Sequence, residues 1–444
     1  MNKQAILKTL SDFVAIQSVS TKPAHWPEMM RAVSFLGDKF TSLGFEVEVI
    51  KSKTEKAPPL LVASRIISPS VKTLGIYGHY DVQPEDPLSE WNSGPYSLTL
   101  KDGKIVGRGV ADNKGHVIQN ISAIENLINA NQLKHNVVFL IEGEEELGSE
   151  HFEELVIQAK NRIKTADVFY INDGEMYGKN KPAIEYALRG LVSLEIELEI
   201  GKQDLHSGAY GNRAINPVLV AADLITKIKD SKTGKIVIPE FNDAVRTISE
   251  EERTLLKSIY KSDELEQEEM GTYGVVSLEK ANPTLSSKIY PSFDVHGIKG
   301  GYTDPGSKNI IPRSVSFKCS FRLVENQDPQ IIEKLVIDFI TQNVPNGVKC
   351  TITKQGVTPP FYTSIDNGEV TKMAEIMGKV FGNKTVFTRS GGSVGAAGVL
   401  QNLFHKPVLL SGFVLPDCGM HSPNENFDEE MFWKGIEAMQ QVFT

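Results

Sequence analysis

The chain has little cysteine, no long apolar run and no excess of basic residues. Each of these absences argues against one class of protein. Its 444 residues include only Cys319, Cys350 and Cys418, too few and too scattered for a disulfide framework. No segment is apolar enough for a membrane span, and the N-terminus lacks the apolar core of a signal peptide. We therefore expect a cytoplasmic protein that does not bind membranes.

The charge balance is mildly acidic. The formal net charge is −9, whereas proteins that bind nucleic acids need basic surface to attract phosphates. We therefore expect no nucleic-acid partner. The hydrophobic fraction of 40% and the charged fraction of 23% are those of an ordinary globular protein, and the length favours two domains.

Hydrophobic patterning divides the chain. Short apolar runs alternate with helical patterns over residues 1–186, which is typical of a mostly parallel sheet wrapped by helices. From 187 the pattern becomes that of antiparallel strands with one wet face, with strands at 191–200 and 315–323 and a helix around 216–229. Residues 250–269 read as one solvated helix, and residues 357–360 as a linker. The α/β pattern then returns. We expect a discontinuous catalytic α/β domain (1–186 and 358–444) with an inserted α+β domain (187–357).

Polar residues follow the apolar runs of the first domain. His79, the triplet 144–146 and Asp173 each come directly after such a run, and His421 follows the run at 408–415. The carboxyl ends of parallel strands meet at one edge of the sheet, where ligands bind. The sequence therefore predicts a metal site at this edge.

The residue types suit two divalent cations. The three carboxylates of Asp112, Glu146 and Asp173 and one bridging hydroxide balance the four positive charges of two ions. The neutral imidazoles of His79 and His421 complete the coordination. Mixed imidazole and carboxylate ligands favour two Zn²⁺ ions, with Mn²⁺ or Co²⁺ as substitutes. Paired ions of this kind activate water and polarise a substrate carbonyl.

Two further acidic residues have roles in this prediction. Asp81 lies two residues after His79, on the same side of an extended strand, and would orient the imidazole rather than bind metal. In the triplet, Glu146 is assigned to metal and Glu145 to general-base catalysis. A run of three glutamates is otherwise typical of solvated surface, and only the apolar run before it favours the site.

Five motifs give the sequence a family resemblance. It resembles the M20 family of metallopeptidases along nearly its whole length, and within it the branch of cytosolic non-specific dipeptidases and carnosinases. The matching segments are Gly-His-Tyr-Asp-Val-Gln-Pro at 78–84, Gly-Arg-Gly-Val-Ala-Asp-Asn-Lys-Gly at 107–115, Glu-Gly-Glu-Glu-Glu-Leu-Gly-Ser at 142–149, Asp-Leu-His-Ser-Gly at 204–208 and Gly-Met-His-Ser at 419–422.

The resemblance implies a zinc-exopeptidase-like catalytic domain with a pair of zinc ions. One ion would be held by His79 and Asp173, the other by Glu146 and His421, with Asp112 between them. Glu145 matches the general base and Asp81 the acid that orients histidine. A cis peptide bond is implied after Asp112.

The resemblance also implies substrate contacts and an assembly. The inserted domain would be a lid and a homodimerisation surface, and His206 would act in the partner subunit's site. Arg322 matches the arginine that binds the substrate's terminal carboxylate, and Ser393 lies in a glycine-rich loop at the substrate site. Asn309 stands where these dipeptidases usually carry threonine. Ser390 and Gly395 replace a glutamate and a proline of the family pattern, which leaves recognition of the substrate's amino end open.

The expected function is hydrolysis of dipeptides or short peptides with a free C-terminal carboxylate. The alternative is an N-acyl-amino-acid deacylase of the same family, a desuccinylase or deacetylase, because its metal chemistry is identical. A non-catalytic metal-binding protein is a third reading, against which Glu145 argues, since structural zinc sites usually lack a free base.

Overall fold

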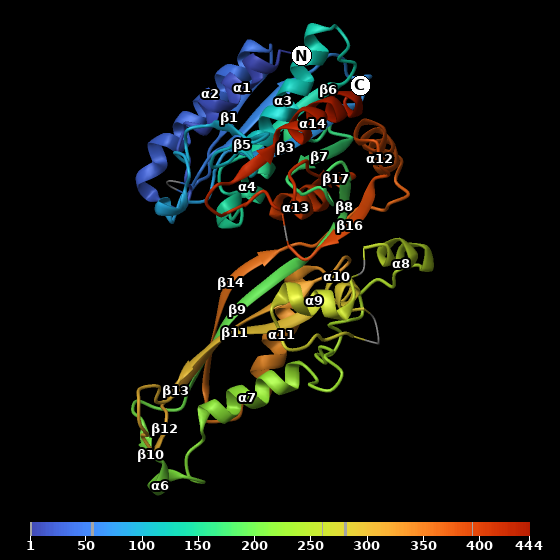
Figure 1. Cartoon of the computed structure of the whole chain (residues 1–444). Coiled ribbons are helices and arrows are strands. Elements are labelled where there is room, and N and C mark those ends of the chain that lie inside the picture. Colours follow the sequence, from blue (N-terminus) through green and yellow to red (C-terminus); the bar gives the residue numbers. More distant parts are fainter. Residues whose placement is uncertain (1, 55–56, 260, 279–281, 393) are drawn as a thin grey trace. The chain divides into compact units, whose positions relative to one another are not determined.

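The computed structural model describes residues 2–54, 57–259, 261–278, 282–392 and 394–444. The chain divides into two compact units, each considered by itself. The first contains Met1–Tyr186, Thr363–Thr388 and Val394–Thr444, and the second contains Ala187–Tyr362 and Arg389–Ser393 (Figure 1). The first unit is thus built from sequence on both sides of the second.

A mixed sheet has most of its strands in the first unit, whereas β15 and the ends of β8 and β16 consist of residues assigned to the second unit. The strand order is β1-β2-β6-β3-β7-β17-β8-β15, and β16 also pairs with β8. The pairs β6–β3, β3–β7 and β7–β17 are parallel, whereas β1–β2, β2–β6 and β17–β8 are antiparallel. The strands are β1 (Glu46–Ile50), β2 (Leu60–Arg65), β3 (Thr73–His79), β6 (Asn136–Glu142), β7 (Val168–Asn172), β8 (Ala183–Leu188), β15 (Phe361–Tyr362), β16 (Val386–Ser390) and β17 (Val408–Ser411).

The central strands are apolar because helices cover them. Every residue of β3, β6 and β7 is buried, so side chains of both faces lie in the core. The helices of this unit are α1 (Lys3–Val14), α2 (Trp26–Ser42), α3 (Lys114–Asn129), α4 (Phe152–Gln158), α5 (Lys160–Ile163), α12 (Gly368–Phe381), α13 (Gly395–Phe404) and α14 (Glu429–Val442), with 3-10 turns η1 (Pro23–His25), η2 (Leu88–Glu90) and η3 (Glu145–Leu147). Helix α3 is buried along most of its length and packs against α1 and α14. A small antiparallel sheet combines β4 (Thr99–Lys101), β5 (Lys104–Val106) and β18 (Asn426–Asp428).

The second unit is built on an antiparallel sheet of order β11-β13-β9-β14. Buried and accessible residues alternate along β9, so one face is apolar and the other polar. Helices α7 and α11 pack on this sheet and share its core. The elements are β9 (Gly190–Glu199), β10 (Leu205–His206), β11 (Ser292–Gly300), β12 (Ile310–Ile311), β13 (Ser314–Leu323), β14 (Lys349–Thr358), α6 (Ser207–Tyr210), α7 (Pro217–Ile228), α8 (Glu250–Lys257), α9 (Asp263–Met270), α10 (Pro283–Ile289) and α11 (Pro329–Asn343).

Two local predictions were wrong. Residues 250–269 form two helices, because α8 ends at Lys257 and Ser262 caps α9 by accepting a hydrogen bond from the amide of Leu265. The predicted linker begins inside a strand, since Val357 and Thr358 are the last residues of β14. Among the described helices, none is both long and apolar enough to cross a membrane.

Candidate metal centre

Neighbouring parallel strands of the first unit bring predicted ligands to the same edge of the sheet. His79 is the last residue of β3, and its register partner on the parallel strand β6 is Glu142, two residues before Glu144. On the other side of β3, Tyr77 pairs with Ile171 of β7, two residues before Asp173. The parallel register therefore aligns three strand ends, as the apolar runs predicted.

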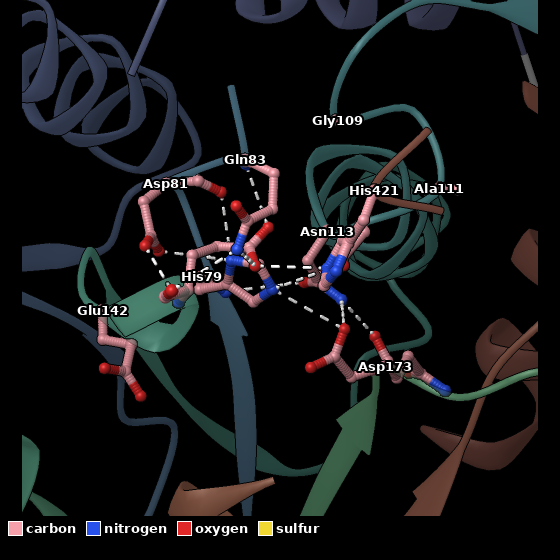
Figure 2. Close-up of polar contacts among 12 residues, drawn as sticks. His79, Asp81, Gln83, Gly109, Ala111, Asn113, Glu142, Asp173 and His421 are labelled. Atoms are coloured by element: carbon pink, nitrogen blue, oxygen red, sulfur yellow. Dashed lines mark hydrogen bonds and ion pairs between the residues drawn. The ribbon is translucent and has the colours of Figure 1, made fainter. Parts of the chain in front are cut away.

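Two groups of potential ligands meet at these strand ends and share Asp112. In the first, Nε2 of His79 lies 2.9 Å from Oδ1 of Asp112 and 3.6 Å from Oδ1 of Asp173. In the second, Nε2 of His421 lies 3.0 Å from Oδ2 of Asp112 and 3.2 Å from Oε2 of Glu146. Figure 2 shows His79, Asp173 and His421 converging in this arrangement. Asp112 thus turns a different oxygen toward each histidine, as a carboxylate between two ions would.

The electrostatics of the centre suit bound cations. Burial, together with the charges of neighbouring carboxylates, raises the pKa of Asp173 and of Glu146 above their usual range. Hydrogen bonds from His421 and His79 outweigh burial and lower the pKa of Asp112, while bonds to Asp112 and Glu146 raise the pKa of His421 to about 10. Buried carboxylates at such density are stable only as partners of cations or as neutral acids. The imidazole and carboxylate donors fit two divalent ions such as zinc.

Residues around the ligands hold them in place. Oδ1 of Asp81 lies 3.3 Å from Nδ1 of His79, and its Oδ2 accepts a hydrogen bond of 3.1 Å from the amide of Glu146. The side-chain amide of Gln83 donates to Oε2 of Glu146 at 2.8 Å, and that of Asn113 donates to Oδ1 of Asp173 at 2.6 Å. Sequence reasoning missed Gln83 and Asn113, whose only signal is that they lie inside the segments of His79 and Asp112.

Glu145 belongs to neither of the two ligand groups. Its side chain forms no hydrogen bond or ion pair with any residue that the structure describes, whereas Glu144 accepts from the amide and Nδ1 of His151 at 3.0 and 2.9 Å. Burial and the nearby charges of Asp173 and Asp112 raise the pKa of Glu145 well above its usual range. A carboxylate of raised proton affinity without a structural partner has the properties of a general base.

A third missed residue, Glu425, supports the loop of Asp112 from the far end of the sequence. The carboxylate of Glu425 accepts hydrogen bonds from the backbone amides of Gly109, Ala111 and Asp112 at 3.0, 2.8 and 3.1 Å. It also pairs with the guanidinium of Arg108. The peptide bond from Asp112 to Asn113 is cis, as the resemblance implied.

The predicted substrate residues lie in the second unit and form two separate sets. His206 of β10 pairs with Ile310 of β12, next to Asn309, and both predicted residues are exposed. Arg322 lies near the far end of β13, and the strand between Ser314 and Arg322 spans about 26 Å. One chain therefore does not bring Arg322 together with His206 and Asn309. Ser393 lies outside the described residues.

Comparison with known proteins decides the family. The model of peptidase family M20/M25/M40 matches residues 75–444. The chain belongs to this family. A Beta-Ala-His dipeptidase of Homo sapiens is 31% identical over 460 residues, covering 100% of this chain and 90% of the relative. A Cys-Gly metallodipeptidase of Schizosaccharomyces pombe is 31% identical, covering 98% of this chain and 94% of the relative.

Solved structures agree with the M20 assignment. The crystal structure of an M20 family metallo-carboxypeptidase from Sulfolobus solfataricus has a TM-score of 0.85 at 30% identity, covering 100% of this chain and 99% of the other. The structure of human carnosine dipeptidase 1 has a TM-score of 0.73 at 30% identity, covering 99% and 96%. The resemblance to M20 peptidases and the α/β fold class are confirmed, and the chain is a metal-dependent hydrolytic enzyme.

Proposed function

We propose that this M20 enzyme is a two-zinc dipeptidase that hydrolyses dipeptides and short peptides with a free C-terminal carboxylate. The observation that carries the proposal is the pair of ligand groups sharing Asp112, together with Glu145, a carboxylate on which the charges of Asp112 and Asp173 act. The relatives named for dipeptide hydrolysis support the substrate class.

The proposal gives each residue of the centre a role. His79 and Asp173 would hold one ion, Glu146 and His421 the other, and Asp112 both. Bound there, two divalent cations acidify water and polarise the scissile carbonyl. Mn²⁺ or Co²⁺ would substitute for zinc, because the donor set does not exclude them.

The other residues act on protons and on orientation. Glu145 takes the proton of the attacking water and returns it to the leaving nitrogen, and its raised pKa favours the first transfer. The backbone carbonyl of Asp81 accepts a hydrogen bond from Nδ1 of His79 at 3.1 Å, and its Oδ1 lies 3.3 Å from the same nitrogen, so that Nε2 presents its lone pair to the site.

Recognition of substrate is proposed for the second unit. Arg322 would bind the terminal carboxylate, because a guanidinium matches it with two parallel hydrogen bonds. His206, Asn309 and Ser393 would contact the substrate, with His206 donating to the developing oxyanion in the partner subunit of a homodimer. The distance of His206 and Asn309 from Arg322 along β13 supports a contribution from a second copy. We also propose residues 187–357 as the lid and dimerisation domain, and a cytoplasmic location.

A substrate panel tests this function. The zinc-loaded enzyme should hydrolyse unmodified dipeptides, and N-acetyl and N-succinyl amino acids should react poorly, because the relatives are dipeptidases. Turnover of acyl amino acids alone would reverse the assignment. A protein that binds metal yet hydrolyses neither class would have the non-catalytic function.

A further inference from the structure

Arg189 is a buried cation of the second unit without an anionic partner. Arg189 is 8% exposed and directly precedes β9. One guanidinium nitrogen, Nη2, donates to the carbonyl of Tyr290 at 3.2 Å and to Oγ of Ser292 at 2.8 Å, while the buried Nε has no partner. Within the described part of the chain, no carboxylate forms an ion pair with Arg189. Burying an unpaired charge is costly, so this guanidinium calls for an anion.

Strand register places Arg189 beside Arg322. On β13, Arg322 lies directly opposite Leu191 of β9 on one side and Ser292 of β11 on the other. Residues directly opposite in an antiparallel sheet share one face. Arg189 directly precedes β9, and its side chain bonds to Ser292 on β11, so it reaches past the end of β13 that carries Arg322. The two guanidinium groups therefore lie on the same face of the sheet, around Ser292.

Arg189 and the two charged groups that act on it, Arg322 and Asp294, leave one positive charge uncompensated. Burial and the positive charge of Arg322 lower the pKa of Arg189 to about 10, and Asp294 opposes this effect. Asp294 lies two residues after Ser292 on β11, on the same face, and is exposed. Among described residues Arg322 also has no ion pair. Two guanidinium groups and one carboxylate leave a net charge of one.

We propose that Arg189 and Arg322 together form a binding site for a single carboxylate group, and that this group is the C-terminal carboxylate of the substrate. The inference deepens the proposed function, in which Arg322 alone had this role. Arg322, partly accessible, would bind the carboxylate directly, while Arg189 supplies a second, fixed positive charge held by Ser292 and Tyr290. A guanidinium immobilised before binding loses little side-chain entropy when the anion arrives.

The charge count also predicts a limit on specificity. With Asp294 in place, the C-terminal carboxylate of the substrate already neutralises the net positive charge of the site. A C-terminal residue with a side-chain carboxylate adds a second negative charge that no positive charge of the site balances. L-alanyl-L-glutamate should therefore bind no more tightly than L-alanyl-L-alanine. Replacing the exposed Asp294 by Asn raises the net charge to two and should favour the glutamate peptide about tenfold over its wild-type preference.

Binding measured without turnover tests the site. The background is the zinc-loaded full-length Glu145→Gln protein, and calorimetry compares L-alanyl-L-alanine and N-acetyl-L-alanine with their C-terminal amides. Arg189→Met should weaken binding of the free acids about tenfold and leave the amides unchanged. Arg189→Lys, which keeps the charge, should recover part of the loss. Lys318→Met is the matched control, because it removes an exposed positive charge from the same face of β13 and should change neither ligand.

The outcomes separate this site from the proposed activity. Equal losses for acids and amides in a folded Arg189→Met protein, checked by thermal unfolding, would assign Arg189 a purely structural role and overturn the proposal. If Arg189→Met does not fold, the Asp294→Asn comparison decides, and an unchanged preference for the glutamate peptide counts against the site. Failure of the proposed dipeptidase function would be seen separately, as absent dipeptide hydrolysis by the wild-type enzyme. The binding test does not depend on that function, because L-alanyl-L-alanine and N-acetyl-L-alanine carry the same C-terminal carboxylate.

Discussion

Arg108 and Glu425 form a fully buried ion pair of 2.7 Å, although 317 positions separate them in the sequence. The Glu425 carboxylate also accepts from the amides of the loop that ends at Asp112. The pair therefore joins the C-terminal segment after His421 to the segment that carries Asp112, the proposed shared ligand, and its loss should affect both stability and metal binding.

We expect Arg108→Met to lower the free energy of unfolding by about 3–5 kcal/mol, because it leaves a buried carboxylate without its cation. Urea denaturation measures the change. The double variant Arg108→Met/Glu425→Gln should be less destabilised than the sum of its single variants, since neither charge remains. Additive losses would show that the two side chains contribute independently.

Metal content should follow the two ligand groups. The wild type is expected to bind two zinc ions per chain, and Asp173→Asn is expected to bind only one with high affinity. Asp112→Asn should weaken the binding of both ions, because Asp112 belongs to both groups. Elemental analysis after gel filtration measures the ratio. Chelation should also lower the melting temperature, since a ligand at 100 times its dissociation constant stabilises the folded state by about 2.7 kcal/mol. A single ion in the wild type would contradict the shared role of Asp112.

The clustering of the candidate ligands followed from the sequence because parallel strands impose one geometry. Apolar runs before His79, Glu146 and Asp173 predicted buried strands, and the carboxyl ends of such strands meet at one edge. Their assembly needed no knowledge of loops.

What the sequence did not reveal depends on loops and on local hydrogen bonds. Glu425 and Gln83 act through backbone amides or neighbouring side chains, and such contacts leave no periodic pattern. The break between α8 and α9 was missed because apolar Leu255 and Leu265 lie on both sides of it and no glycine or proline stands between them. Ser262 nevertheless starts a new helix by capping α9.

Glu145→Gln should separate catalysis from metal binding. The amide cannot accept the proton of water, so kcat should fall about 10²–10⁴-fold, while the zinc content stays at its wild-type value. Steady-state hydrolysis and elemental analysis measure the two effects. Glu150→Gln is the control, because it makes the same change at an exposed position of the same loop and should keep activity. Substantial activity in Glu145→Gln would remove it as the general base.

Alkaline pH should weaken the contribution of Cys319 to stability. Burial raises the pKa of this thiol to about 12 from 9.0, so the folded state keeps the proton that the unfolded chain loses. The stabilisation is complete below pH 9 and is lost as pH rises toward 12. The advantage of the wild type over Cys319→Ala in free energy of unfolding should shrink by about 1.4 kcal/mol per pH unit above 9. An advantage constant from pH 8 to 10.5 would contradict the shift.

A mixed dimer tests whether His206 acts in the partner subunit. His206→Ala and Glu145→Gln should each inactivate the homodimer, by loss of the oxyanion donor and of the base. If His206 works across the interface, a heterodimer of the two variants contains one site with both residues intact and one site that lacks both. Co-expression with two different affinity tags isolates it, and we expect about half of the wild-type kcat. If His206 instead serves its own chain, each site of the heterodimer lacks one residue and the activity stays at the level of the single variants. The strand of about 26 Å that separates His206 from Arg322 in one chain favours the first result.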